Sequence, residues 1–317
     1  MTYTSEINPK DTSWSGEYPF KSNTFELSNG LTMHYLDEGP KEHAPSILMV
    51  HGNPTWSFYY RRLVSHFSGD YRCVAPDHIG CGLSEKPDRE DYPYTLEERI
   101  ANLTELVTSL DLQDITLVIH DWGGAIGMGL AANLPERIKR IVVFNTAAFR
   151  SDRIPFSIDI CRIPGFGPLA VQGFNGFVRV AQIRAIHHKD RLKGPVGDGY
   201  VAPYNSWKNR IAVQRFVEDI PMDSDHPTYT TLKHVEDNLE QFQDRPMLIV
   251  WGERDFCFNP SFRREWERRF PRAEVHALKD ASHYVLEDAH ELIIPWMENF
   301  FTENPITHDQ DDASSSN

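Results

Sequence analysis

Five short apolar segments recur along the chain, and each is continuously apolar rather than alternating. They are Ser46–Val50, Tyr71–Pro76, Ile115–His120, Ile141–Phe144 and Met247–Trp251. A strand that is apolar at every position is buried on both faces, as happens in a parallel sheet covered by helices. Two further runs, TFEL and LTMHYL, flank the turn sequence SNG and predict a β-hairpin ahead of this sheet.

The segments between these runs have helical patterns. Residues Thr95–Leu110 carry apolar side chains at helical spacing, and Thr95 followed by Glu98 predicts a capping box at the start of that helix. Residues Gly123–Asn133 are small and apolar, which predicts a buried helix. Alternating strands and helices favour a mostly parallel α/β sheet.

This alternation stops between Phe144 and Met247, where no comparable strand is found. The intervening residues have helical segments broken by Pro and Gly, so we interpret them as a helical cap inserted between two strands. We therefore divide the chain into an N-terminal extended arm (1–23), a core in two pieces (24–150 and 222–303), a helical cap (151–221) and a disordered tail (304–317).

Composition narrows the function classes. The chain has 32 Lys and Arg against 46 Asp and Glu, a formal charge of −14, which disfavours binding to nucleic acid or to an anionic membrane surface. There is no apolar run long enough to span a bilayer, and the first 20 residues have no signal-peptide core. The four cysteines form no C-x-x-C pair. We expect a cytoplasmic protein that binds neither nucleic acid nor membrane.

The sequence VIHDWGGAIG places Asp121 at a corner between a buried strand and a helix. Such a corner is similar to the nucleophile elbow G-x-S-x-G, with Asp121 in the serine position. The simpler alternative is that Asp121 only caps the helix. A carboxylate is already ionised near neutral pH, so it could displace a leaving group at an sp³ carbon and form an ester. Hydrolysis of that ester would then need a base.

His283 is the candidate base, because its loop follows the last predicted strand and precedes the last helix. His120 is a rival, but it neighbours Asp121 on a strand and should point to the opposite face, which favours a supporting role. Asp255 follows the strand MLIVW and is the candidate acid that orients His283. Glu253 is its competitor, two residues nearer the strand.

HGNPTW, which follows the first buried strand, supplies Asn53. The backbone N–H groups of Asn53 and Trp122 are candidate oxyanion-hole donors. Their side chains add an amide and an indole N–H, and two neutral donors beside a nucleophile could hold a departing halide. Taken alone, Asn53 could simply form a turn before Pro54, and Trp122 could simply fill a wall.

Together the segments HGNPTW, DHIGCGLS, VIHDWGG, WGERD and SHYVLED resemble the haloalkane dehalogenase family. The resemblance implies an α/β-hydrolase fold, in which a mostly parallel central sheet is flanked by helices and carries an inserted helical cap. It implies that Asp121 displaces a halide held by Asn53 and Trp122, and that His283, oriented by Asp255, activates water. It implies no metal or organic cofactor. The partners would be a small apolar halogenated substrate, water and halide, with a possible homo-oligomer.

Other activities share these motifs. The same subfamily contains proteins similar to β-lactone decarboxylases of long-chain olefin biosynthesis, and the motifs do not separate the two. Epoxide hydrolases also have H-D-W-G and need cap tyrosines, for which Tyr200 and Tyr204 are candidates. Trp122 argues against fluoroacetate dehalogenases, which place arginine there. A non-catalytic binding protein is disfavoured, because all three triad residues are present.

The cap should set the shape of the pocket. Phe144, Phe149, Phe174 and Phe177 are candidates to line an apolar cavity. Such a cavity would suit haloalkanes and alkyl lactones equally, so the substrate stays open at this point.

Overall fold

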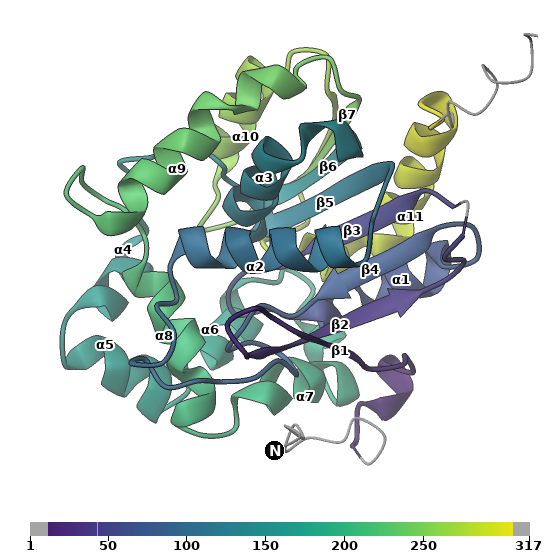
Figure 1. Cartoon of the computed structure of the whole chain (residues 1–317). Coiled ribbons are helices and arrows are strands. Elements are labelled where there is room, and N and C mark those ends of the chain that lie inside the picture. The colour runs from purple at the N-terminus through teal and green to yellow at the C-terminus, as the bar shows by residue number, and fades with distance from the viewer. Residues whose placement is uncertain (1–11, 43, 307–317) are drawn as a thin grey trace, which may run out of the picture.

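An eight-stranded sheet runs through the centre of the computed structural model, which describes residues 12–42 and 44–306 (Figure 1). The strand order is β1-β2-β4-β3-β5-β6-β7-β8. The strands are β1 (Asn23–Glu26), β2 (Thr32–Glu38), β3 (Ser46–Val50), β4 (Arg72–Pro76), β5 (Ile115–Asp121), β6 (Ile138–Thr146), β7 (Met247–Gly252) and β8 (Glu274–Leu278). β1, β2 and β4 pair antiparallel, and all pairs from β4 through β3 to β8 are parallel.

The pattern of apolar residues predicted this sheet correctly. All residues of β3, β5 and β7 are buried, as expected for strands covered on both faces. The predicted hairpin is β1 paired with β2, in a register that places Phe25 opposite Met33. The α/β class and the mostly parallel sheet are therefore confirmed.

Helices cover both faces of the sheet. Successive residues of a strand point to opposite faces, so Val118 packs into one core while Leu117 and Ile119 pack into the other. The first core includes α1 (Arg61–Phe67) and α11 (Val285–Glu303). The second includes α2 (Leu96–Ser109), α3 (Gly123–Asn133), α9 (Pro227–Asp237) and α10 (Pro260–Arg269).

Both predicted helices are present. α2 begins after Thr95, whose hydroxyl accepts a hydrogen bond from the backbone N–H of Glu98 at 3.4 Å. This is the N-cap half of the predicted capping box. α3 is buried over most of its length, which explains why its sequence has small apolar residues rather than an amphipathic stripe.

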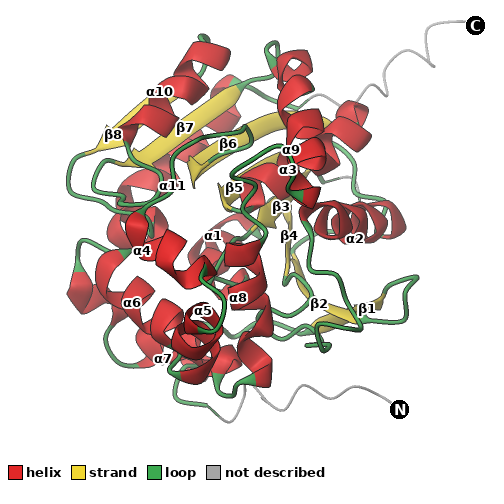
Figure 2. Ribbon diagram, turned by 90° about the vertical axis from the view of Figure 1, so that its left-hand side faces the viewer, coloured by secondary structure: helices red, strands yellow, loops and turns green. Residues whose placement is uncertain are grey.

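Residues 151–221 contain helices and no strand, and Figure 2 shows these helices gathered at one end of the sheet. They are α4 (Phe156–Asp159), α5 (Phe166–Pro168), α6 (Gly176–Arg184), α7 (Pro195–Val201) and α8 (Ile211–Glu218), joined by 3₁₀ turns and one π turn at Leu169–Gly173. We call this segment the cap. The helical insert agrees with the sequence, whereas the domain boundaries themselves stay predictions.

A buried polar cluster attaches the cap to the core. Glu287 of α11 accepts two hydrogen bonds from Arg61 of α1, one of them at 3.0 Å, and a third from the hydroxyl of Tyr200 on α7 at 2.7 Å. The neighbouring Asp288 accepts from the backbone N–H groups of His187 and His188. A buried ion pair is tolerable when its remaining hydrogen-bonding capacity is used, as it is here.

The N-terminal segment differs from the extended arm predicted for residues 1–23. Ser15–Glu17 form a 3₁₀ turn, and the flanking Trp14 and Tyr18 are both buried. The ring of Trp14 lies edge-on to that of Trp56, with centroids 5.5 Å apart. Aromatic burial outweighs the polar composition of the segment. Residues 1–11, and residues 307–317 of the predicted disordered tail, lie outside the described residues.

Within residues 12–42 and 44–306, no helix is both long enough and apolar enough to cross a bilayer.

The contact between β3 and the start of α3 is tight enough to test. A Cβ at Gly123 would overlap the backbone carbonyl of Val50, which is part of the sheet and has little freedom to shift. We expect Gly123→Ala to lower the free energy of unfolding by about 1–3 kcal/mol or more, as overpacking does. Urea denaturation measures the change.

The matched control is Gly69→Ala, because a Cβ at Gly69 meets no atom within 4 Å. Its effect should stay within about 0.5 kcal/mol, as for ordinary surface substitutions. Equal midpoints for the two variants would contradict the proposed packing at the strand–helix corner.

Candidate active site

Asp121 lies at the corner between β5 and α3 in a left-handed backbone conformation, with φ of 53°. Asp is among the few non-Gly residues that adopt this region. Its carboxylate accepts a hydrogen bond from the backbone N–H of Asn53 at 2.5 Å and another from the backbone N–H of Trp122. Neither donor belongs to the first turn of α3, so the simple capping alternative is not supported.

The loop after β3 approaches this carboxylate closely. A Cβ at Gly52 would overlap Oδ1 of Asp121, so glycine at that position lets the chain bring the Asn53 N–H into reach. On the other side, the hydroxyl of Thr146 donates to the backbone carbonyl of Asp121. The strained residue is therefore held by its neighbours in the sheet.

His283 lies beside Asp121, in the loop between β8 and α11. Its Nδ1 is 2.8 Å from Oδ2 of Asp255, and its Nε2 is 3.6 Å from Oδ2 of Asp121. Because a carboxylate only accepts, Nδ1 carries the proton shared with Asp255, and Nε2 faces the candidate nucleophile. Burial lowers the pKa of His283, but the charges of Asp255 and Asp121 outweigh it and raise that pKa above its ordinary value.

Asp255 follows β7 and is oriented by its own loop. Its Oδ1 accepts the backbone N–H groups of Cys257 and Phe258, at 2.6 and 3.1 Å. Its competitor Glu253 instead pairs with Arg263 at 2.8 Å. The geometry thus brings Asp255, and not Glu253, to His283.

His120 has the supporting position expected of it. Its Nε2 donates to the backbone carbonyl of His283 at 2.9 Å, and its ring is stacked on that of Tyr59. Burial, with the nearby His283, lowers the pKa of His120 well below its ordinary value, so it is neutral. A neutral imidazole can fix the loop without adding charge to the site.

Opposing effects act on the pKa of the Asp121 carboxylate. Burial raises the pKa of Asp121, while His283 and the two backbone N–H groups work in the opposite direction. A carboxylate that is poorly solvated and held by only a few donors is a better nucleophile than one in water.

Asn53 and Trp122 both line the cavity next to Asp121. The side-chain amide of Asn53 donates one hydrogen to the carbonyl of Val213 on α8 at 3.1 Å, which leaves one hydrogen for a ligand. The ring of Trp122 lies against Phe216, with centroids 5.5 Å apart. Asn53 and Trp122 are therefore brought together as predicted, and α8 of the cap contacts both of them.

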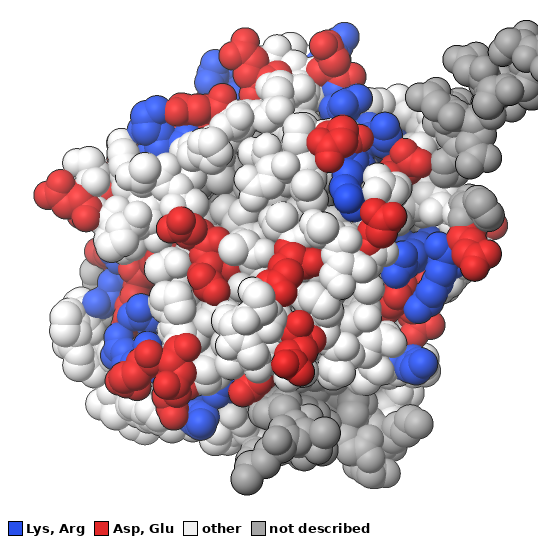
Figure 3. Space-filling model, viewed as in Figure 1, with Lys and Arg blue, Asp and Glu red and all other residues white. Residues whose placement is uncertain are grey.

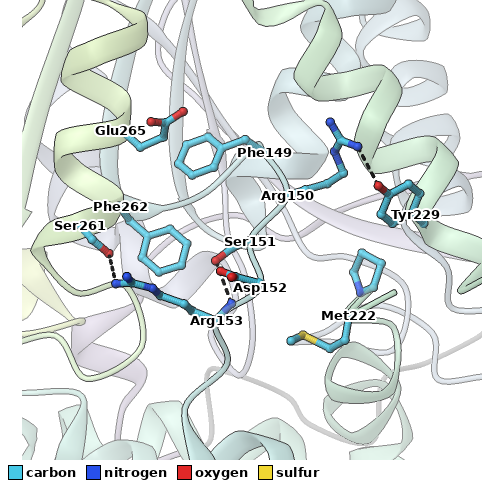
Figure 4. Close-up of a pocket in the computed structure, with 11 residues that line it drawn as sticks. Phe149, Arg150, Ser151, Asp152, Arg153, Met222, Tyr229, Ser261, Phe262 and Glu265 are labelled. Carbon is cyan, nitrogen blue, oxygen red and sulfur yellow. Dashed lines mark hydrogen bonds between the residues drawn. The ribbon is translucent and has the colours of Figure 1, made fainter. Parts of the chain in front are cut away.

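The cavity has a volume of about 130 Å³, and its wall is largely apolar. The apolar residues come from the cap side (Ile154, Pro155, Ile158, Phe177, Val217 and Ile220) and from the core (Ala125, Ala147, Phe149, Leu232, Phe258 and Phe262). A hollow of about 470 Å³ adjoins it, and the two share Phe149, Arg153 and Phe262 (Figure 4). Asp121 thus lies at the wall of a small, largely apolar chamber next to a wider space.

Four phenylalanines were predicted to line the pocket, and two do so. Phe149 and Phe177 contribute to the wall. The prediction is wrong for Phe144, which is buried in the core that contains α1 and α11. It is also wrong for Phe174, which is 72% exposed on the cap. Whether an aromatic residue faces the cavity depends on how the short cap helices turn, which sequence spacing does not give.

The cap tyrosines do not reach the cavity. The hydroxyl of Tyr200 donates to Glu287, and that of Tyr204 lies 3.3 Å from the carbonyl of Thr55. An epoxide hydrolase would need such hydroxyls at the ring oxygen, so the geometry removes the support for that alternative.

Phe258 was missed by sequence reasoning. Its ring is stacked on that of His283, with an interplanar angle of 16°. Its position three residues after Asp255 was the available signal, because a loop that orients the acid also brings its neighbours to the histidine. Among the described residues, no cluster of His, Cys, Asp or Glu could hold a metal ion.

The dependence of His283 on Asp255 can be tested directly. In Asp255→Asn the charge that raises the pKa of His283 is lost while burial remains, so that pKa should fall. An NMR titration of the histidine ring measures it. Glu253→Gln is the control and should leave the titration unchanged, whereas a shift there and none in Asp255→Asn would reverse the assignment.

Several curated proteins are similar to this chain. A cis-3-alkyl-4-alkyloxetan-2-one decarboxylase of Shewanella oneidensis is 45% identical over 289 residues, which cover 90% of this chain and 89% of that protein. The protein of the same name from Xanthomonas campestris is 41% identical, covering 91% and 98%. Haloalkane dehalogenase 2 of Mycobacterium tuberculosis is 30% identical, covering 86% and 92%.

Solved structures agree on the fold. A haloalkane dehalogenase of Agrobacterium tumefaciens matches with a TM-score of 0.77 and 26% identity, over 89% of this chain and 96% of that one. The tetrameric haloalkane dehalogenase of Paraglaciecola agarilytica matches with a TM-score of 0.74 and 23% identity, over 93% and 95%. The family model of the α/β hydrolase fold matches residues 45–290. The chain therefore belongs to the α/β hydrolase fold family and is related to both the oxetanone decarboxylases and the haloalkane dehalogenases.

Proposed function

We propose that this enzyme decarboxylates cis-3-alkyl-4-alkyloxetan-2-ones, which are strained β-lactones, rather than releasing halide from haloalkanes. The observation that carries the proposal is the difference in similarity. Relatives with the decarboxylase name are 45% and 41% identical over about nine-tenths of the chain, whereas those named dehalogenases are 30–32% identical. The family resemblance gave dehalogenation as the main interpretation and β-lactone decarboxylation as the alternative, and this difference in identity reverses their order.

The reaction needs no water in its balance. The ring oxygen–C4 bond and the C2–C3 bond break, a double bond forms between C3 and C4, and carbon dioxide leaves with both lactone oxygens. Every atom of the substrate appears in the alkene or in carbon dioxide. The site must therefore assist bond cleavage without consuming a co-reactant.

In our proposal Asp121 attacks C4, the sp³ carbon that carries the ring oxygen. The backbone N–H groups of Asn53 and Trp122, which would stabilise the oxyanion of an attacked substrate carbonyl, are already used by the carboxylate of Asp121. Attack on a lactone carbonyl would lack that stabilisation. Displacement at C4 needs none, and it opens the ring to a free carboxylate and an alkyl ester on Asp121.

The second step regenerates Asp121. The free carboxylate loses carbon dioxide, the electrons of the C2–C3 bond form the alkene, and the C4–oxygen bond to Asp121 breaks. His283 in its charged form, with Nε2 3.6 Å from Oδ2 of Asp121, would stabilise the carboxylate that leaves. Inversion at C4 followed by anti elimination converts a cis-lactone into a cis-alkene.

The remaining polar groups have a place in this scheme. The free N–H of the Asn53 amide and the indole of Trp122 would hold the carboxylate released on ring opening, in the position that a halide takes in the dehalogenase interpretation. The apolar wall of the cavity suits alkyl substituents. The adjoining hollow could hold the end of an alkyl substituent that is too long for the chamber.

Dehalogenation is the second candidate. It is favoured by the 30% identity to a curated haloalkane dehalogenase and by the arrangement of two neutral donors beside Asp121. It differs from decarboxylation in one requirement, because the ester on Asp121 must then be hydrolysed by water that neutral His283 activates.

A side-by-side assay distinguishes the two activities. With a cis-3,4-dialkyl-oxetan-2-one we expect a cis-alkene by gas chromatography, and with a 1-bromoalkane of similar length we expect little bromide. Asp121→Asn should remove alkene formation, since an amide is a poor nucleophile. Rapid bromide release with no alkene would overturn the proposal, and a mixture of cis- and trans-alkenes would overturn the two-step path.

The pH dependence gives an independent test. The pKa of His283 is raised, so its charged form persists to higher pH than in a free histidine. Decarboxylation, which uses ionised Asp121 and charged His283, should be fast between the pKa of Asp121 and that of His283 and decline as the pH rises through the pKa of His283. Hydrolysis of an ester uses the neutral form and should decline as the pH falls. A kcat profile that drops toward low pH through the His283 titration would contradict the assigned role.

A further inference from the structure

Exposed large apolar side chains are concentrated on the cap. Eight of the nine in the described part of the chain belong to it, and Leu292 on α11 is the exception. The eight are Phe156, Ile163, Phe166, Leu169, Phe174, Val180, Ile183 and Trp207. Phe156 is 80% exposed, and Ile183 is 58% exposed. Single exposed apolar residues are common, whereas a contiguous patch of them is typical of a binding surface, so their arrangement in space matters.

These residues are carried by elements that pack together. Side-chain atoms of Leu169 and Trp207 lie 3.3 and 3.4 Å from the place of a Cβ on Gly173, so the two residues meet over that glycine. The guanidinium of Arg210 donates to the carbonyl of Gly173 at 3.2 Å. α6 packs against the same π turn and carries Val180 and Ile183 on its outer side. We call the eight exposed apolar residues of the cap, together with the elements that carry them, the cap face.

The charge of the cap is opposite to that of the rest of the chain. Residues 151–221 contain ten Lys and Arg against six Asp and Glu, a net charge of +4. All other residues contain 22 Lys and Arg against 40 Asp and Glu, a net charge of −18. Figure 3 shows acidic side chains over α2 and a mixture of acidic and basic side chains over α5 and α8, so the cap's net charge is a property of the segment and not of this view alone. The overall charge thus hides a basic segment.

The outer side of α6 combines both properties. Arg179, Val180, Ile183 and Arg184 are all exposed, and the helix has no acidic residue. Within the described residues, neither arginine forms a salt bridge, and the guanidinium of Arg184 lies 4.7 Å from the ring of Phe256. Exposed aliphatic side chains flanked by unpaired arginines are typical of a helix that lies at a lipid–water boundary.

The cap face begins at the wall of the cavity. Ile158 of α4 lines the cavity, while Phe156, two residues earlier on the same helix, points to solvent. One short helix thus contributes both to the cap face and to the cavity wall.

We propose that the cap face binds the surface of an anionic lipid bilayer. Apolar side chains would enter the interface while the arginines pair with lipid phosphates, and this gives peripheral binding without a membrane span. A symmetric contact with a second copy through α6 is disfavoured, because it would bury four arginine side chains, Arg179 and Arg184 of each copy, in one interface to which α6 contributes no acidic residue. The expectation that the acidic chain avoids anionic membranes rested on its overall charge, and the proposal departs from it for the cap face. The proposal goes beyond the reaction and does not depend on which substrate is used.

Vesicle co-sedimentation of the full chain tests the proposal. We expect binding to vesicles of phosphatidylcholine with about 30 mol% phosphatidylglycerol, which carry a negative surface potential as a cytoplasmic leaflet does, and much weaker binding to phosphatidylcholine alone. Arg179→Gln should weaken binding by about five-fold, the contribution of one basic residue near such a surface. Phe174→Ser with Ile183→Ser should weaken it by roughly ten-fold. Added salt should reduce binding to all anionic vesicles.

Matched controls come from the core. Leu292→Ser removes the exposed apolar residue outside the cap, and Arg264→Gln removes an exposed arginine of α10. Both should bind as the unaltered chain does, and all variants should keep the same thermal midpoint and turn over a short-chain substrate equally. If the unaltered chain binds neither kind of vesicle, or if the control variants lose as much binding as the cap-face variants, the proposal is overturned. A cap-face variant that changes the elution volume in size exclusion, with vesicle binding unchanged, would assign the surface to a second copy instead.

Discussion

The buried carboxylate of Asp121 imposes the constraint on which the rest of the site depends. A charge in an apolar chamber is unstable unless donors and an opposite charge lie close to it. The fold supplies these from two other strand ends, with the Asn53 N–H following β3 and His283 following β8. Asp255, which follows β7, then compensates the charge of His283. Each charged group is thus stabilised by the opposite charge of the next one.

The geometry of the parallel sheet explains why so much of the site could be predicted from sequence. Parallel strands end at one edge of the sheet, so residues directly after continuous apolar runs must come together there. Asn53, Asp121 and Asp255 all follow such runs. Their proximity needed only the strand positions and not the details of packing. His120 was also predictable, because alternation along β5 turns it away from Asp121.

The arrangement of the cap side chains could not be predicted as well from the sequence, for physical reasons. Its helices are short and are joined by 3₁₀ and π turns, so the helical phase is lost every few residues. Phe174 and Phe177 are three residues apart, yet one is exposed and the other lines the cavity. The burial of Trp14 was missed for a related reason, because its partners Trp56 and Phe58 are distant in sequence. Contacts of this kind are decided by tertiary packing.

The hydrogen bond from the Asn53 amide to the carbonyl of Val213 joins the active site to the cap. The amide stands between two acceptors, the carbonyl of α8 and any anion formed in the chamber. One hydrogen of the amide is bonded to that carbonyl and the other is left for the anion, so an anion bound in the chamber orients the same group that contacts α8. Occupancy of the chamber and attachment of the cap are therefore linked free energies, and each must alter the other by the same amount. Binding of an anionic product in the chamber would thus change how firmly α8 is held, while the Glu287 cluster keeps α7 on the core.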